Sequence, residues 1–402
     1  MMNKAPLPIN PGLLRWAREQ AGLSPEEAAK RARLKPPRKK RDGPELTAAD
    51  LLLAWEKGER APSLSHLEEM AKAYQRPLLT FFLPAPPIQQ TSLADFRPIA
   101  NKQHVKDSPE FSALKRRIEA LHDELKEIAA LEGFPRLPFV GSVTQHSPLK
   151  QIVENIRDVL GFSFTDQQRI QNKEKFISAL RQRAHDAGIF ILFEGNLGSH
   201  HTNISPEEFR GLALAHQTVP LIVINTNDAT AARIFTLVHE LGHIWFGDSG
   251  VSNFDALGRP RLQSAVVARE MLCNALAGEF LIPEAAFRDA WQPGDENASG
   301  QIERLARLFK ISRAVVARRL LDLDMIADTI YWPLLKNYNL NWEKSKQKIK
   351  AQSGPSRNVL DKYRLGQKLV HMVMDAVSNG RITVQEAARM LRVPASRFDK
   401  VL

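Results

Sequence analysis

The sequence predicts a mainly helical α+β protein with several domains, and three observations predict this class. The 402 residues are enough for two or three folded units at roughly 150 residues per domain. Hydrophobic residues make up 43% and charged residues 25%, the balance of an ordinary globular protein. Apolar residues recur at helical spacing along most of the chain, while short apolar runs typical of strands, Ile189 to Phe193 and Leu221 to Ile224, stand in the middle.

The composition excludes several classes of protein. Cys273 is the single cysteine, which excludes an internal disulfide framework and a zinc site of several thiolates and leads us to expect a reducing, cytoplasmic compartment. Because the chain has no signal-peptide pattern and no apolar run near the roughly 20 residues that span a bilayer, we expect no membrane partner. The formal net charge of +11 favours a polyanionic partner such as nucleic acid, and a basic but merely solvated surface is the alternative.

Composition also divides the chain into four predicted segments. They are residues 1–82, 83–146, 147–290 and 291–402. The second starts with the proline-rich Leu83–Pro87 and continues in an amphipathic helix, Pro109 to Gly133, which we expect to bridge two domains. The last segment is helical, with outlines of low specificity that look like helix-turn-helix units at Ile302–Leu323 and Ile382–Leu402. For both outlines we favour packing against the protein or a dimer partner over a second DNA contact.

The first segment predicts four short helices. Gly22 ends the first helix, and Ser24 is an N-cap for a second that has Pro25 at its first position. A third helix extends from Thr47 to Lys57, and a fourth begins after Ser63. Four short helices of this kind are typical of a helix-turn-helix bundle.

Two short sequences in this segment resemble those of a known family. Gly22-Leu23-Ser24 and Trp55-Glu56-Lys57-Gly58-Glu59-Arg60-Ala61-Pro62-Ser63-Leu64 are similar to the Xre family of lambda-repressor-like helix-turn-helix proteins. The resemblance implies a double-stranded DNA operator as partner and a homodimer that reads two half-sites. It also implies that residues 47–54 enter the major groove, with Thr47, Ala48 and Asp50 at the leading end.

The segment departs from the family pattern in two ways. Pro25 stands where the family usually has a glutamine that contacts DNA, and the turn after the second helix is enlarged. That turn contains the basic residues Arg38, Lys39, Lys40 and Arg41. These side chains either bind phosphates without reading sequence or form a solvated loop. A protein-interaction module of the same fold is the alternative to DNA binding.

The sequence His239-Glu240-Leu241-Gly242-His243 predicts a metal site on a helix. Histidines four positions apart project from the same side of a helix, so both imidazoles can reach one ion. Glu240 is placed to take a proton from the attacking water. An apolar run at residues 219–225 predicts a strand just before this helix, and Asn227 or Asp228 offers the N-cap.

A catalytic zinc needs a third protein ligand, and with one cysteine a carboxylate is expected. The next predicted helix, Ser264 to Phe280, supplies Glu270 and Glu279, which point to opposite faces, so only one can meet the ion. We favour Glu270, because Asn274 lies one turn further on and can orient a ligand through a hydrogen bond. Glu279 fits a structural role near the helix end. Two imidazoles and one carboxylate suit one Zn²⁺ per chain.

The same part of the chain closely resembles the ImmA/IrrE family of metallo-endopeptidases. The matching segments, in family order, are residues 209–211, 220–225, 235–243, 270–274 and 280–283. The resemblance implies a minimal zincin core over about residues 147–283, with His239, His243 and Glu270 as zinc ligands and Glu240 as general base. It further implies cleavage of an Xre-type repressor. The fusion of this core to a repressor-like N-terminal domain resembles the arrangement in transcriptional regulators that are sometimes paired with a toxin.

Some residues have a less specific signal. His200, His201 and Tyr331 are candidates to stabilise the oxyanion, although such residues are more often surface or core residues. Arg210 is either structural or orients the substrate.

Two interpretations of the whole chain remain. In the first, the protein is a DNA-tethered zinc endopeptidase that cleaves a repressor or itself. In the second, it is an antitoxin or transcriptional repressor of a toxin–antitoxin or mobile-element locus, and its zincin domain binds metal or a partner protein without proteolysis. The intact motif with Glu270 favours the first, because a protein that only binds has no physical need for the Glu240 base.

Overall fold

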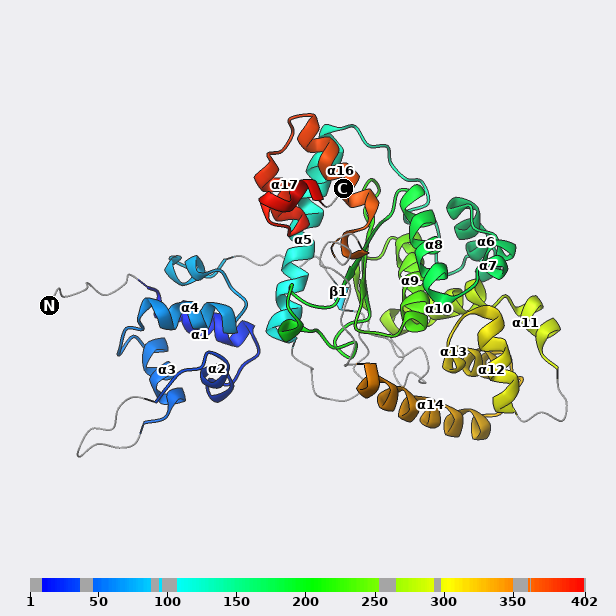
Figure 1. Cartoon of the computed structure of the whole chain (residues 1–402), viewed down its shortest axis with the longest axis horizontal. Coiled ribbons are helices and arrows are strands. Elements are labelled where there is room, and N and C mark those ends of the chain that lie inside the picture. Colours follow the sequence, from blue (N-terminus) through cyan, green and yellow to red (C-terminus); the bar gives the residue numbers. More distant parts are fainter. Residues whose placement is uncertain are drawn as a thin grey trace. The chain divides into compact units, whose positions relative to one another are not determined.

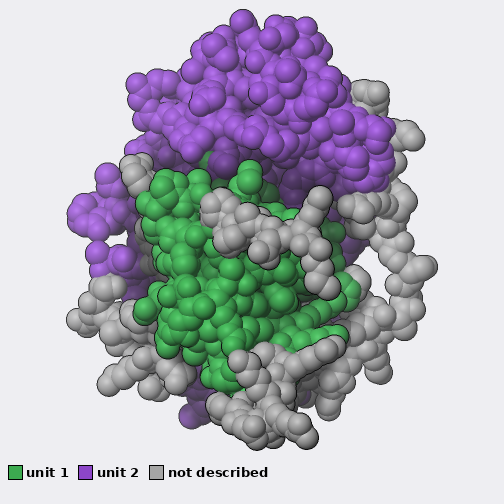
Figure 2. Space-filling model, turned by 90° about the vertical axis from the view of Figure 1, so that its left-hand side faces the viewer, with its two compact units in different colours: residues 1–91, 103–119, 196–204 green, residues 92–102, 120–195, 205–402 purple. Residues whose placement is uncertain are grey.

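A computed structural model describes residues 9–36, 46–87, 94–95, 107–252, 265–292, 298–349, 361 and 363–400. The contacts between residues divide the chain into two units, which are coloured green and purple in Figure 2. The first comprises residues 1–91, 103–119 and 196–204, and the second comprises residues 92–102, 120–195 and 205–402. The four segments expected from composition remain a prediction.

The first unit contains the four short helices that the sequence predicts (Figure 1). They are α1 (Pro11–Gln20), α2 (Pro25–Arg31), α3 (Ala48–Glu56) and α4 (Leu64–Ala73), followed by the 3-10 helix η1 (Leu78–Phe82). Ser24, Thr47 and Ser63 cap α2, α3 and α4, because each side-chain oxygen accepts a backbone N–H of the first turn. The apolar faces of the helices meet in one core that includes Leu14, Leu52, Trp55, Leu67, Met70 and Phe81.

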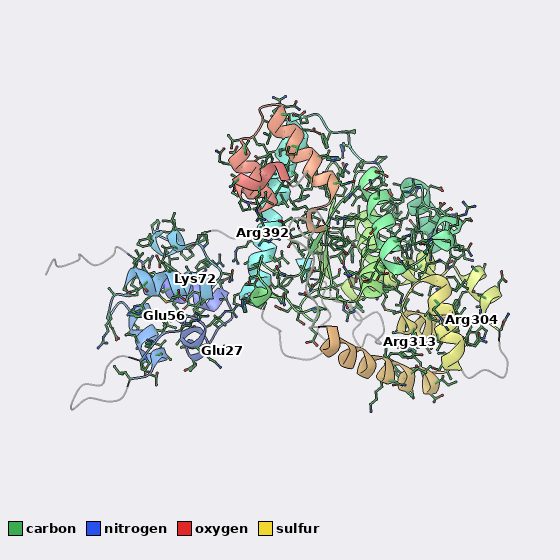
Figure 3. The ribbon with its side chains drawn as sticks, viewed as in Figure 1. Glu27, Glu56, Lys72, Arg304, Arg313 and Arg392 are labelled. Atoms are coloured by element: carbon green, nitrogen blue, oxygen red, sulfur yellow. The ribbon has the colours of Figure 1, made fainter. Side chains whose placement is uncertain are left out.

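A buried ion pair fastens α1 to the end of α3. The Arg18 guanidinium donates from Nε to Glu56 Oε1 at 2.6 Å and from Nη2 to Glu56 Oε2 at 2.9 Å. Its third nitrogen, Nη1, donates to the Leu23 carbonyl at 3.0 Å. Figure 3 labels Glu56 among the side chains of this unit. The Trp55-Glu56 string therefore contributes both a core ring and the acceptor that fixes the first helix.

The predicted amphipathic helix is confirmed as α5 (Pro109–Leu131). Its apolar residues at three- and four-residue steps are all buried: Leu114, Ile118, Leu121, Leu125 and Ile128. Residues 109–119 of this helix belong to the first unit and the remainder to the second.

The second unit is built on a mixed sheet with the strand order β1-β5-β3-β4-β2. The strands are β1 (Ala94–Asp95), β2 (Phe190–Glu194), β3 (Gly211–Leu214), β4 (Leu221–Asn225) and β5 (Gly250–Ser252). Strand β2 runs parallel to β4, and β3 runs antiparallel to both β4 and β5. The apolar runs predict β2 and β4, whose residues are all buried. The other three strands are too short for the pattern to predict.

The second unit also contains helices (Figure 1). They are α6 (Leu149–Leu160), α7 (Phe164–Arg169), α8 (Lys173–Asp186), α9 (Thr230–Phe246), α10 (Ala265–Leu281), α11 (Glu284–Ala290), α12 (Ala298–Phe309), α13 (Arg313–Asp322), α14 (Asp328–Ile349), α16 (Gln367–Ser378) and α17 (Val384–Leu391), with the 3-10 helix η3 (Ala395–Lys400). Of these, α8 and α9 pack against the sheet. One hydrophobic core extends from Phe139 to Tyr338 along the chain. The mainly helical α+β class is confirmed. Among the described residues, no helix is long and apolar enough to cross a membrane.

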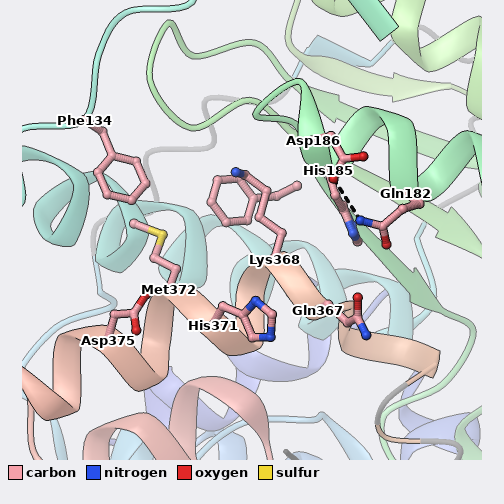
Figure 4. Close-up of a pocket in the computed structure, with 10 residues that line it drawn as sticks. Phe134, Gln182, His185, Asp186, Gln367, Lys368, His371, Met372 and Asp375 are labelled. Atoms are coloured by element: carbon pink, nitrogen blue, oxygen red, sulfur yellow. Dashed lines mark hydrogen bonds between the residues drawn. The ribbon is translucent and has the colours of Figure 1, made fainter. Parts of the chain in front are cut away.

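The C-terminal helices pack against α5 and the edge strand β2. Arg389 of α17 pairs with Glu124 at 2.8 Å, and Arg364 pairs with Glu194 at 2.8 Å. Between α8 and α16 this packing leaves a cavity of about 260 Å³. Figure 4 shows its lining, which includes Phe134, His185, Lys368, His371, Met372 and Asp375. The ion pairs agree with the prediction that the last segment packs against the protein.

Candidate metal centre

The His-Glu-x-x-His motif lies on α9, whose start differs from the prediction. The helix begins at Thr230 with no side-chain cap, so the expected N-cap at Asn227 or Asp228 is wrong. Asn227 instead donates from Nδ2 to the Gly195 carbonyl at 2.6 Å, and Asp228 lies 3.4 Å from Arg210. Both side chains serve tertiary contacts that the local sequence does not reveal.

Three predicted ligands come together between α9 and α10. The ligand atoms of His239, His243 and Glu270 all lie within 4.8 Å of one another. The two histidine Nε2 atoms are 3.1 Å apart, and Glu270 oxygens lie 3.3 Å from His239 Nε2 and 3.0 Å from His243 Nε2. Ligand atoms about 2.0 to 2.1 Å from a tetrahedral zinc are about 3.3 Å from each other. The distances within the cluster are close to this spacing, so the three side chains are compatible with such a site.

Further side chains orient the two imidazoles. His239 Nδ1 lies 2.9 Å from Asn274 Oδ1, and because an amide oxygen only accepts, Nδ1 carries the proton and donates. Its Nε2 lone pair then faces the cluster. Ser252 Oγ, at the end of β5, lies 3.3 Å from His243 Nε2. The predicted role of Asn274 thus has the required geometry.

Glu240 lies beside these ligands in a fully buried position. Neither of its carboxylate oxygens has a hydrogen-bond partner among the described residues. Burial raises its pKa to about 7, against the opposing influence of His243 and His239. A carboxylate with this pKa exchanges protons near neutral pH, as a general base must.

Glu270 is also fully buried, but its pKa is lowered, whereas the pKa of Glu240 is raised. Burial by itself would raise the pKa of Glu270, but the adjacent His239 and His243 hold that pKa at about 2. Its oxygens lie 3.3 Å from His239 Nε2 and 3.0 Å from His243 Nε2, so the two imidazoles are its partners in the described part of the chain. A buried, ionised carboxylate beside two imidazoles fits a cation held by all three side chains.

Two glycines allow this close packing, and sequence patterns alone do not single them out. A Cβ at Gly211, the first residue of β3, would lie 2.2 Å from Glu240 Oε1. A Cβ at Gly242 would lie 3.2 Å from Cys273 Sγ, so the bare glycine lets α10 approach α9. Gly211 stands in the Phe209–Gly211 segment of the family resemblance, which is the one signal that could have found it.

Comparison with protein-family models agrees with this geometry. Residues 184–321 match the peptidase M78 model, described as the IrrE N-terminal-like domain, and residues 12–79 match a helix-turn-helix domain. This chain joins a helix-turn-helix domain to an IrrE-like peptidase domain. The IrrE-like match includes His239, Glu240, His243 and Glu270, and the predicted fusion is confirmed.

Comparisons with individual proteins add little. A Mycobacterium tuberculosis transcriptional regulator of known structure is 20% identical, with a TM-score of 0.28. The alignment covers 43% of this chain and 46% of that chain, so it spans less than half of that protein. We draw nothing from a TM-score this low. No curated protein matches the chain.

The second carboxylate of α10 has a structural place in the IrrE-like domain. Glu279 forms a buried ion pair with Arg319 of α13 and also accepts the backbone N–H of Glu284 at 3.3 Å. It therefore links the ligand helix to α11 and α13. This agrees with the preference for Glu270 as the ligand.

The remaining candidates of the peptidase lie apart from the cluster or outside the described side chains. His201 is an exposed residue of the 3-10 helix η2 (His200–Thr202), which belongs to the first unit, and the side chain of His200 lies outside the described set. Tyr331 is fully buried in the main hydrophobic core. Arg210 pairs with Asp228 and lines a separate cavity. None of the four side chains is among those described around the metal ligands.

In the helix-turn-helix domain, α3 begins one residue later than the predicted start at Thr47. Thr47 and Asp50 form a capping box: the Asp50 N–H donates to Thr47 Oγ1 at 3.1 Å, and the Thr47 N–H donates to Asp50 Oδ2 at 2.8 Å. Both side chains are exposed, and Ala48 is half-buried. The basic turn residues Arg38, Lys39, Lys40 and Arg41 lie outside the described residues.

Proposed function

We propose that this chain is a DNA-tethered zinc endopeptidase that cleaves a repressor-type protein, or itself, to switch gene expression. One observation carries the proposal: the Nε2 atoms of His239 and His243 lie 3.1 Å apart, each is 3.0 to 3.3 Å from a Glu270 oxygen, and the buried Glu240 carboxylate beside them has no hydrogen-bond partner in the described residues. A purely structural cluster would satisfy the Glu240 carboxylate. The residues present therefore fit one metal ion held by His239, His243 and Glu270.

The donor set favours zinc, and each side chain has a role in this proposal. Two neutral imidazoles and one carboxylate suit Zn²⁺, which supplies Lewis acidity that polarises the substrate carbonyl. Asn274 holds the His239 ring in the tautomer that presents Nε2 to the ion. Glu240 accepts a proton from the attacking water and returns it to the leaving amine, for which a pKa of about 7 is suited.

The helix-turn-helix domain supplies the DNA partner in this proposal. The leading end of α3 enters the major groove of an operator, with Thr47, Ala48 and Asp50 near the bases. Arg38, Lys39, Lys40 and Arg41 contact phosphates, and two chains bind as a homodimer on two half-sites. The exposed positions of Thr47 and Asp50 support this arrangement.

The burial of the centre favours a second function. Glu240 and Glu270 are 0% exposed, and His239 is 4% exposed, so the described arrangement holds a metal without exposing the base to a peptide. A regulator or antitoxin whose zincin domain binds metal or a partner protein without proteolysis fits this closed site. The endopeptidase needs the site to open when substrate binds.

The test compares wild type, His239→Ala and Glu240→Gln. We expect one zinc per chain in wild type and in Glu240→Gln, and loss of zinc in His239→Ala, measured by elemental analysis. Loss of regulation in Glu240→Gln with operator binding unchanged would support the peptidase. Normal regulation by Glu240→Gln would contradict it and favour the second function. Absence of zinc from wild type, even after zinc is offered, would contradict the peptidase and leave a DNA-binding regulator whose zincin domain binds a partner protein without metal.

A further inference from the structure

Besides the cavity between α8 and α16, the second unit contains a larger cavity away from the metal centre. Its volume is about 830 Å³, and none of the three ligands or Glu240 lines it. It lies at the N-terminal end of α9, where Ala229, Ala231 and Ala232 form one wall. His239 is nine positions beyond Thr230, or about 13 Å along the helix at 1.5 Å per residue. We call this cavity the anion pocket for the reasons below.

Basic side chains predominate in the lining of the anion pocket. Five are basic, Lys173, Arg210, Arg307, Lys310 and Arg313, and three are acidic, Glu174, Asp228 and Glu303. Asp228 is committed to Arg210, and Lys310 donates to the Gln168 carbonyl at 2.8 Å. Lys173 and Arg313 have no carboxylate partner in the described part of the chain. Burial lowers the pKa of Lys173 against the opposing influence of Glu174, and the nearby Arg313 lowers it further. Two neighbouring cations in one cavity favour an anion there.

The start of α9 adds to this positive field. This helix of 17 residues has no side-chain cap, and only alanine side chains cover its first turn in the cavity wall. Uncapped N–H groups at a helix N-terminus bind phosphate oxygens through their partial positive charge. The starts of α8 at Lys173 and of α13 at Arg313 line the same cavity, but the side chains of Asn172 and Ser312 cap them.

Tyr338 of α14 supplies an independent polar group. It is 9% exposed and lines the cavity, and the Arg313 guanidinium lies 5.0 Å from the centre of its ring. Its hydroxyl, although near Ser299, makes no hydrogen bond of ordinary geometry within the described residues. Figure 3 labels Arg313 on α13, next to α14. A ligand in the cavity could therefore bond to the Tyr338 hydroxyl and pair with the exposed Arg313 guanidinium.

We propose that the anion pocket binds a small phosphate-bearing ligand of about mononucleotide size. The volume lies within the roughly 300 to 1,000 Å³ of small-molecule sites. Guanidinium groups and helix N-terminal amides complement phosphate oxygens, and the Tyr338 ring and the alanines offer apolar surface to the rest of the ligand. Because the ligand would sit against the start of the helix that bears His239, its binding is placed to influence the metal centre. This inference does not depend on proteolysis.

The test is calorimetric titration of the full chain as purified with inorganic phosphate, AMP and ATP as probes. We expect wild type to bind AMP or ATP more tightly than inorganic phosphate, and Arg313→Gln to weaken that binding at least about tenfold. Arg318→Gln is the matched control, because Arg318 lies on the same helix, pairs with Asp322 at 2.8 Å and does not line the cavity. Lys173→Gln replaces Arg313→Gln if the latter does not keep the wild-type melting temperature.

Three results would overturn the proposal. The first is no binding of any probe to wild type at millimolar concentration. The second is equal affinity in Arg313→Gln, Lys173→Gln and wild type. The third is binding of a short DNA duplex that Arg313→Gln weakens while AMP and ATP do not bind, which would assign these cations to DNA phosphates instead.

Discussion

The bare Cα of Gly211 lies against the carboxylate of Glu240, so that a Cβ at Gly211 would come within 2.2 Å of Glu240 Oε1 and 2.7 Å of its Cδ. Strand β3 and helix α9 therefore approach each other closely at Glu240. Because Glu240 is fully buried, its carboxylate has little free space into which it can move. A residue that bears no side chain therefore limits the position of the Glu240 carboxylate.

We predict that Gly211→Ala displaces Glu240 and lowers endopeptidase activity while zinc still binds. The added methyl group overpacks a closed site, which costs about 1 to 3 kcal/mol of stability. Cleavage of a repressor substrate, zinc content and melting temperature are the three measurements. The control is Gly278→Ala in α10, where a Cβ would be 3.9 Å from Arg319 and contacts are ordinary. Full activity of Gly211→Ala would mean that Glu240 is not the base.

The hydrogen bond from His239 to Asn274 leads to a second prediction. Asn274→Ala removes the acceptor that orients the ring, and we expect zinc affinity to fall about 10- to 100-fold. Competition with a zinc-binding dye measures this change. The matched control is Asn155→Ala, because Asn155 accepts a hydrogen bond from Trp245 of the same helix at 2.7 Å but touches no ligand. Equal zinc affinity in both variants would refute an orienting role for Asn274.

The ligand set could be predicted because most of it is local. His239 and His243 share a helix face by their spacing alone, and Glu270 and Asn274 share a face of the next helix for the same reason. The buried strands β2 and β4 likewise follow from continuous apolar runs. Nothing beyond periodicity is needed for these features.

The contacts between distant segments could not be predicted in this way. Gly211 meets Glu240 only through the antiparallel register of β3 with β4, in which Gly211 pairs with Ile224. Strand β3 has four residues, too few for an alternating pattern to be distinguished from a loop. The N-cap prediction was wrong because Asn227 and Asp228 make contacts with distant residues, Gly195 and Arg210. Local sequence patterns contain no information on the register between distant strands. They also do not show which distant groups compete for a polar side chain.

The buried Arg18–Glu56 pair leads to a third prediction, for the helix-turn-helix domain. Glu56→Gln leaves the Arg18 charge without its counter-charge in a site where the two side chains are 10% and 3% exposed. Breaking such a pair costs about 3 to 5 kcal/mol, so we expect this domain to unfold at lower temperature and operator binding to weaken. Arg15→Gln is the control, because the Arg15–Glu19 pair is exposed and surface pairs contribute about 0 to 1 kcal/mol. Equal melting curves for the two variants would disprove the stabilising role of the buried pair.

The fourth prediction concerns the acid stability of the second unit. His122 is buried and donates from Nε2 to the Val219 carbonyl at 2.9 Å; burial lowers its pKa to about 4. The unfolded chain, with a histidine pKa of about 6.5, therefore binds a proton that the folded protein resists. Stability is lost as pH falls from about 6.5 toward 4, by on the order of 2 to 3 kcal/mol. Unfolding by urea at several pH values should show a flatter pH dependence for His122→Gln than for wild type. His146→Gln, at an exposed residue, should keep the wild-type dependence; a parallel pH dependence in all three proteins would exclude His122 as a source of acid sensitivity.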